Sequence, residues 1–102
     1  MSASRSTGPT ERRARSGSPT AGQVARLVAG ELGELLGREP EGVVGLARTE
    51  DGWRVGVEVL EIRRVPDTAD VLAEYEVDTD ARGRIQGYRR TRRYERGRVS
   101  DD

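Results

Sequence analysis

The stretch from residue 52 to residue 66 constrains the fold more than any other part of the chain. Every second residue in its first half is large and apolar, namely Trp53, Val55, Val57 and Val59. This period of two predicts a β-strand with one buried face. Glu50-Asp51-Gly52 indicates a turn just before it, and Pro66 ends it because proline has no N–H group for a sheet ladder. The stretch therefore predicts a half-buried strand of an antiparallel sheet.

The flanking residues predict three further strands. Before the turn, apolar residues indicate a strand over 43–49 that forms a hairpin with the first. After the proline, a turn and at most one helical turn, over 71–73, lead to a strand over 74–80. A tight turn follows, in which Gly83 is free to take a positive φ. The last strand, over 84–94, then returns antiparallel to its predecessor.

Four residues are assigned structural roles: Trp53, Pro66, Tyr75 and Gly83. Trp53 is expected to anchor the core where a helix meets the sheet. Tyr75 shares a strand face with Val77 and Thr79. In the strand that begins at Trp53, Leu60 and Ile62 are apolar at positions where the alternation predicts an outward-facing residue. We therefore expect either a bulge or a strand end that is covered on both faces.

A helix is predicted before the sheet, beginning after Thr20 as N-cap and ending at Gly37 as C-cap. Its apolar face consists of residues near a 3.6-residue period: Val24, Leu27, Val28, Leu32, Leu35 and Leu36. Gly30 and Gly33 each lower its intrinsic stability by about 1 kcal/mol relative to alanine, so it needs a sheet to pack on. A loop over 38–42 should connect it to the strands. The fold class is thus α+β, one helix on a four-stranded antiparallel sheet.

Length and composition set the domain organisation. The chain has 102 residues, of which 33% are apolar and 35% charged, so its core must be small. Residues 1–19 are polar and basic and are expected to be a disordered tail, followed by one α+β domain over 20–96 and a flexible tail over 97–102. No apolar run suggests a membrane span or a secretory signal, and we expect a cytoplasmic protein.

Catalytic and metal chemistry find little support in the sequence. Cysteine and histidine are both absent, which removes thiolates, the usual general base and the commonest transition-metal ligand. The loop over 78–83 lacks the later bidentate glutamate of a calcium site. Glu58 and Glu61 are the candidate acid/base pair, but both are expected on an exposed strand face. We predict no enzyme, no cofactor and no metal.

The net charge of zero conceals an acidic block beside a basic one. Residues 50–80 carry ten acidic residues and three arginines, whereas residues 81–98 carry eight arginines and Glu95. A hairpin that closes with Asp80 opposite Arg84 would place Asp78 opposite Gln86, Glu76 opposite Tyr88 and Glu74 opposite Arg90, with carboxylates and arginines meeting on the solvent face. That arrangement leaves a surplus at Arg89, Arg92, Arg93, Arg96 and Arg98.

The surplus predicts an external partner. Candidate partner-binding residues are Arg89, Arg90, Arg92, Arg93, Tyr94 and Arg96, together with Arg63 and Arg64. Basic and aromatic residues together are typical of nucleic-acid surfaces, but they also suit an acidic protein face. Since the neighbouring acidic block would repel phosphate, a protein is favoured over nucleic acid.

A long ungapped pattern over about residues 43–96 resembles the gas vesicle protein O (GvpO) family. The residues that carry it run from Asp51-Gly52-Trp53, Val55, Val57-Glu58 and Glu61 through Arg64-Val65-Pro66-Asp67-Thr68, Asp70-Val71-Leu72-Ala73, Tyr75-Glu76-Val77, Asp80 and Gly83 to Tyr88, Arg90 and Arg93-Tyr94. Thr79 departs from the larger apolar residue expected there. The order of elements also resembles PepSY-type or cystatin-like units, which implies nothing about function.

The resemblance implies an accessory protein of gas vesicles, the hollow gas-filled protein shells of prokaryotic cells. It implies no catalysis, no cofactor, a gas vesicle-associated location and partners among other gas vesicle proteins. A nucleic-acid-binding regulator of the same gene cluster and a minor shell component are alternatives. Because the last strand leaves an exposed edge, the chain is expected to be a monomer or a homodimer.

Overall fold

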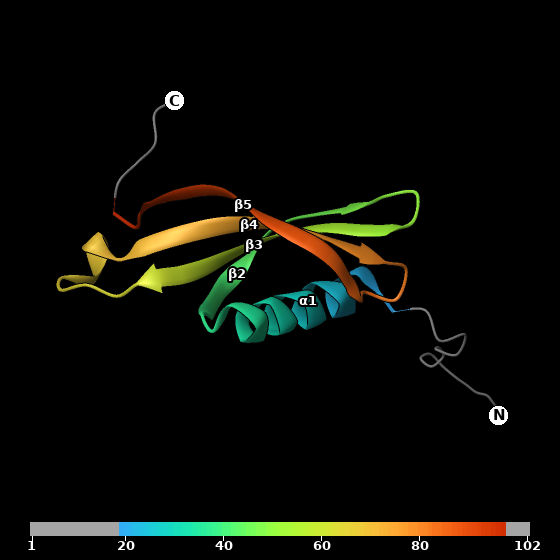
Figure 1. Ribbon diagram of the computed structural model, residues 1–102, viewed down its shortest axis with the longest axis horizontal. Helices are drawn as coiled ribbons and strands as arrows, with labels where there is room; N and C mark the ends of the chain where they lie inside the picture. The colour runs from blue at the N-terminus through green and yellow to red at the C-terminus, as the bar shows by residue number, and fades with distance from the viewer. Residues whose placement is uncertain (1–18, 98–102) are drawn as a thin grey trace.

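The computed structural model describes residues 19–97, which form one helix and a four-stranded antiparallel sheet (Figure 1). The elements are α1 (Ala21–Leu36), β2 (Glu39–Arg48), β3 (Gly52–Ile62), the 3₁₀ turn η1 (Asp67–Ala69), β4 (Val71–Asp80) and β5 (Ile85–Glu95). Strands pair in the order β2-β3-β4-β5, so each lies beside its sequence neighbour. The predicted α+β fold is confirmed. The tails predicted over 1–19 and 97–102 lie almost wholly outside the described residues.

Both ends of α1 are closed as its sequence predicts. The Thr20 hydroxyl accepts a hydrogen bond from the Gln23 backbone N–H at 3.2 Å, and the Gln23 side-chain oxygen accepts one from the Thr20 N–H at 2.9 Å. This reciprocal capping box satisfies two N–H groups that the helix cannot pair internally. At the other end Gly37 takes φ 65°, a left-handed conformation that suits glycine and stops the helix.

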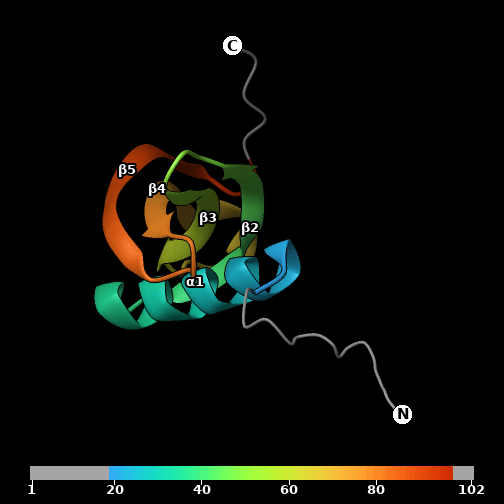
Figure 2. The same ribbon diagram turned by 90° about the vertical axis from the view of Figure 1, so that its right-hand side faces the viewer.

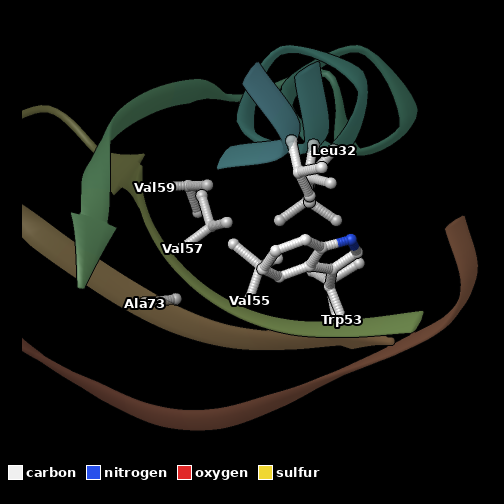
Figure 3. Packing of buried hydrophobic residues seen from close by; sticks show 9 residues of the cluster. Leu32, Trp53, Val55, Val57, Val59 and Ala73 are labelled. Atoms are coloured by element: carbon white, nitrogen blue, oxygen red, sulfur yellow. The ribbon is translucent and has the colours of Figure 1, made fainter. Parts of the chain in front are cut away.

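The core lies between α1 and the inward row of β3 (Figure 3). Val24, Val28 and Leu32 of the helix are fully buried, as are three valines of β3: Val55, Val57 and Val59. Trp53 closes one end of the cluster, and its indole N–H donates to the Ala81 carbonyl at 3.3 Å. Trp53 is thus part of the buried cluster that the sequence placed it in. Burying each of these side chains contributes about 1.5–3 kcal/mol.

The helix covers part of the sheet rather than all of it. It packs mainly on β2 and β3, while β5 starts near the helix and then curves away from it (Figure 2). Leu27 and Leu35, which the helical period placed on the packing face, are consequently exposed. The apolar stripe of α1 is wider than the surface that the helix contacts. The prediction that Leu27 and Leu35 belong to the packing face is therefore wrong.

The strand β2 begins at Glu39, where a loop over 38–42 was predicted. Register shifts at Glu41 and Val44 interrupt its pairing with β3, which hides the period of two in the sequence. The close approach of helix and strand depends on Gly33. A Cβ atom there would lie 2.9 Å from both the Arg38 carbonyl oxygen and the Pro40 ring.

The segment between β3 and β4 also differs from expectation. The short helical turn spans Asp67–Ala69, and the residues predicted to be helical, 71–73, begin β4 instead. Their unbroken apolar run has no strand alternation because both faces are buried at this point. The predicted irregularity of β3 is confirmed as a register shift at Glu61, between Leu60 and Ile62.

The two outer hairpin turns form as predicted. At the first, the Thr49 N–H donates to the Gly52 carbonyl at 2.9 Å. At the second, Gly83 takes φ 89° and donates its N–H to the Asp80 carbonyl at 3.0 Å. The Asp80 carboxylate accepts hydrogen bonds from the backbone N–H groups of Arg84 and Arg82, each at 2.9 Å, which holds the pKa of that carboxyl below its ordinary value.

We expect Gly52→Ala to lower the free energy of unfolding by about 1–3 kcal/mol or more, the range typical of overpacking. A Cβ atom at this position would overlap the Thr79 carbonyl oxygen, a backbone atom that no rotamer change can move. Gly45→Ala is the matched control, since its Cβ would meet nothing within 4 Å. Urea unfolding of both variants tests this, and equal midpoints would contradict the close contact.

Candidate functional site

The strand β5 forms one margin of the sheet and carries the arginines that the sequence singled out. We call Arg89, Arg90, Arg92 and Arg93 the arginine strip; their guanidinium-bearing side chains are between 49% and 73% exposed. The strip is displayed on both faces of one strand, because residues along a strand alternate in direction. Its charges are therefore open to solvent on two sides.

The register of β5 against β4 differs from the predicted one. Glu76 lies opposite Arg89, Glu74 opposite Arg92, and Asp78 opposite Gly87. Two register shifts cause the difference, one that leaves Gln86 and one that leaves Thr91 without a partner residue. The predicted pairs assumed a ladder without bulges, so all three are wrong.

On one face of the sheet, glutamates of β4 hold two arginines of the strip. The Arg89 Nη2 atom lies 2.6 Å from Glu76 Oε1, and the Arg92 Nε atom lies 3.6 Å from Glu74 Oε1. Arg92 also stacks its guanidinium over the Tyr94 ring, 4.4 Å from the ring centre. The β4 carboxylates thus fix the position of both guanidinium groups.

On the opposite face, Glu61 binds the other two arginines of the strip. Its carboxylate lies 2.8 Å from Arg93 Nε and 3.1 Å from Arg90 Nη1, although its side chain is only 8% exposed. Burial raises the pKa of Glu61, but the hydrogen bonds from Arg93 and Arg90 outweigh it and leave the pKa below its ordinary value. Glu61 is therefore a buried, ionised anchor for two half-exposed cations.

The prediction that Glu61 lies on an exposed face is wrong. The alternation of Val57 and Val59 continues to Glu61, and this signal in the sequence could have found it. Glu58 lies across from Glu74, on the other face. Burial, followed by the nearby Glu74 and Glu41 carboxylates, raises the pKa of Glu58. Since the sheet separates the two glutamates, they form no acid/base pair.

Arg96 connects three segments just beyond β5. Its Nη2 atom lies 3.2 Å from Asp70 Oδ2, and its Nη1 atom lies 3.1 Å from Glu41 Oε1 of β2. Asp70 is 2% exposed and also accepts a hydrogen bond from the Arg64 backbone N–H at 2.7 Å. That hydrogen bond, together with Arg96, holds the pKa of the Asp70 carboxyl below its ordinary value despite its burial.

Arg63 and Arg64 lie in the loop after β3, apart in sequence from the strip. The Arg63 Nη2 atom lies 2.9 Å from Glu39 Oε1, and both side chains are well exposed. Arg64 contributes its backbone N–H to Asp70. Sequence reasoning missed Asp70 and Glu41 as anchors, because their partner Arg96 is distant in the chain.

The surplus of unpaired arginines is not observed. Arg89, Arg92, Arg93 and Arg96 each have a carboxylate partner, and Arg98 lies outside the described residues. Sequence spacing could not show this, because two of the carboxylates, Glu61 and Glu41, come from strands that are not adjacent to β5. The strip is still available for contact, since its guanidinium groups remain about half exposed or more.

Other surface features offer little chemistry. A hollow of about 470 Å³ between α1 and β5 is lined by Glu31, Glu34, Leu35, Arg84 and Ile85. Within residues 19–97 no three acidic residues gather as a metal site would require. In the same residues, no helix is long and apolar enough to cross a membrane.

Comparison with known proteins gives a family match over most of the chain. A family model described as gas vesicle synthesis protein GvpO matches residues 6–100. Gas vesicle protein O of Streptomyces sp. (strain CB03234) is 56% identical over 80 residues, which cover 78% of this chain and 62% of that relative. Gas vesicle protein O of Haloferax mediterranei is 43% identical over 70 residues, covering 68% and 50%.

A third relative, gas vesicle protein O1 of Halobacterium salinarum, is 38% identical over 69 residues, which cover 68% of this chain and 58% of the relative. The chain thus spans about half to three fifths of the length of these curated relatives. No solved structure matches the chain.

We expect Asp70→Asn to lower the free energy of unfolding at neutral pH. The variant should also lose less of that free energy than the unaltered chain does when the pH is lowered. Because the folded-state pKa of Asp70 lies below its ordinary value of 3.8, its ionised form stabilises the fold above that pH. This contribution is lost as the pH falls through the lower, folded-state pKa. Urea unfolding between about pH 4 and pH 2 measures the effect.

Asp78→Asn provides the comparison, because Asp78 pairs with Arg54 in a contact that is open to solvent on both sides. It should change stability at neutral pH by about 0–1 kcal/mol at most, because an exposed ion pair contributes little. An acid dependence that Asp70→Asn leaves unchanged would show that the carboxylate is not held ionised by its neighbours.

Proposed function

The chain belongs to the gas vesicle synthesis protein GvpO family, and we propose that it acts in gas vesicle formation as a non-enzymatic accessory protein. In this proposal it works through contacts with other gas vesicle proteins, made by the arginine strip of β5. Family membership supports the process, and the exposure of the strip supports the mode of action. The partner, the mode of contact and the absence of catalysis are parts of the proposal.

The arginine strip is supported as the contact surface because its side chains are both exposed and held in place. Arg89 is 73% exposed, yet one of its nitrogens is fixed by Glu76. A guanidinium has five N–H donors, so an ion pair through one nitrogen leaves others for a partner. Groups already ordered lose less conformational entropy on binding, which favours association.

The same ion pairs argue against nucleic acid as the partner. A phosphate approaching the strip would also approach Glu61, Glu74 and Glu76, which neutralise much of its charge. Nucleic-acid affinity depends on arginines that replace phosphate counterions. A protein face with a few placed carboxylates and backbone carbonyls suits such paired guanidinium groups better, since it does not need a large net positive charge.

We expect an exchange of the two partners, Arg89→Glu with Glu76→Arg, to abolish vesicle formation while leaving the fold intact. The exchange keeps the ion pair and the net charge, but moves the cation from β5 to β4. An exposed ion pair contributes about 0–1 kcal/mol, so stability should change little. Vesicles are scored by electron microscopy in cells whose own copy of this gene is deleted and replaced by the variant.

The matched control exchanges a second exposed pair, Arg54→Asp with Asp78→Arg, which lies on β3 and β4 with a separation of 2.9 Å. This control should support normal vesicles. Normal vesicles with the Arg89 and Glu76 exchange would remove the strip from the proposal. Shell-gene transcript is measured alongside, and transcript lost together with vesicles would favour a nucleic-acid-binding regulator instead.

A further inference from the structure

The two margins of the sheet differ in how they are protected. An edge strand presents unpaired backbone N–H and C=O groups, and proteins usually discourage pairing there with charged side chains. On β5 the arginine strip supplies four such charges. Both β5 and β2 contain two register shifts, so regularity of pairing does not distinguish the margins.

The middle of β2 has no such protection. Residues 42–47 read Gly-Val-Val-Gly-Leu-Ala, without a charged or polar side chain. Val43, Val44 and Leu46 are 40%, 50% and 38% exposed, although they are apolar. Figure 2 shows β2 at the margin of the sheet, with the helix beneath it rather than beside it. An uncharged, apolar edge of this kind favours the addition of another strand.

The charges of β2 lie at its ends and have opposite signs. Glu39 and Glu41 stand at the beginning, and Arg48 stands at the end, where its guanidinium lies 4.7 Å from the centre of the Trp53 ring. A two-fold axis perpendicular to the sheet makes two identical edge strands run antiparallel and brings the same surface of both copies together. Pairing centred between Val43 and Leu46 then places Glu41 of each strand opposite Arg48 of the other, so that this carboxylate, which already lies 3.1 Å from Arg96 of its own chain, gains a second guanidinium.

Within the chain itself, residues 1–18 are poorly suited to occupy this edge. They contain no valine, isoleucine, leucine or aromatic residue, and Pro9 lies in their middle. A strand that covers Val43, Val44 and Leu46 needs apolar side chains of its own. Another copy of β2 supplies them, together with the complementary end charges.

We propose that two copies of the chain associate through antiparallel pairing of their β2 strands. The two four-stranded sheets then form one continuous sheet of eight strands, with β2 and its copy at the centre. The arginine strip of each copy lies at an outer margin, away from this contact. The inference is independent of the proposed role in vesicle formation.

Val44→Lys with Leu46→Lys should weaken association of the full-length chain by about a hundredfold or more, because like charges brought together across an interface oppose it. The matched control, Gln86→Lys with Thr91→Lys, adds the same charge at the two unpaired positions of β5 and should leave the dimer intact. Sedimentation equilibrium over a range of concentrations measures the dissociation constant, and circular dichroism confirms that each variant is folded.

Hydrogen exchange of the unaltered chain provides a second measurement that needs no substitution. Backbone amides over 42–47 should exchange more slowly in concentrated than in dilute solution, while those of β5 remain unchanged. A chain that is monomeric at all concentrations would overturn the proposal. A dimer that survives the two lysine substitutions in β2 would also overturn it. So would a dimer that dissociates on Leu27→Glu with Leu35→Glu, since these exposed leucines lie on α1 and not on β2.

Discussion

The contact between α1 and the inward row of β3 is the interaction on which the rest of the domain depends. β3 pairs with β2 on one side and with β4 on the other. Its buried valines pack against Val24, Val28 and Leu32 of the helix. A 16-residue helix containing three glycines is a weak helix in isolation, so its stability comes from this packing. The strand is correspondingly the one whose alternation is clearest in the sequence.

Electrostatic pairing organises the half of the sheet that the helix leaves uncovered. The acidic and basic blocks of the sequence become opposing strands, and arginine suits this arrangement because its planar group keeps its charge and offers several donors. Pairs on the exposed face contribute little stability each. Glu61 and Asp70 differ, because they are buried and would be left as uncompensated charges if their arginines were removed.

Much of the fold could be predicted from local patterns, whereas the site could be predicted only in part. The caps at Thr20 and Gly37, the anchor at Trp53 and the turn at Gly83 depend on neighbouring residues, and each was found. The ion pairs depend on register, which bulges at Gln86 and Thr91 shift by one residue each. No period in the sequence reports an extra residue of this kind. The arginines themselves were identified, but their partners were not.

The contacts of Arg96 with Glu41 and Asp70 have a mechanical consequence. They tie the first strand of the sheet to the end of the last, across two intervening strands. Flattening a twisted sheet would move its outer strands apart. The tie resists this motion at one end of the sheet, whereas the turns at Gly52 and Gly83 lie at the other. We therefore expect the two hairpin turns to move more than the end of the sheet where Arg96 binds Glu41 and Asp70.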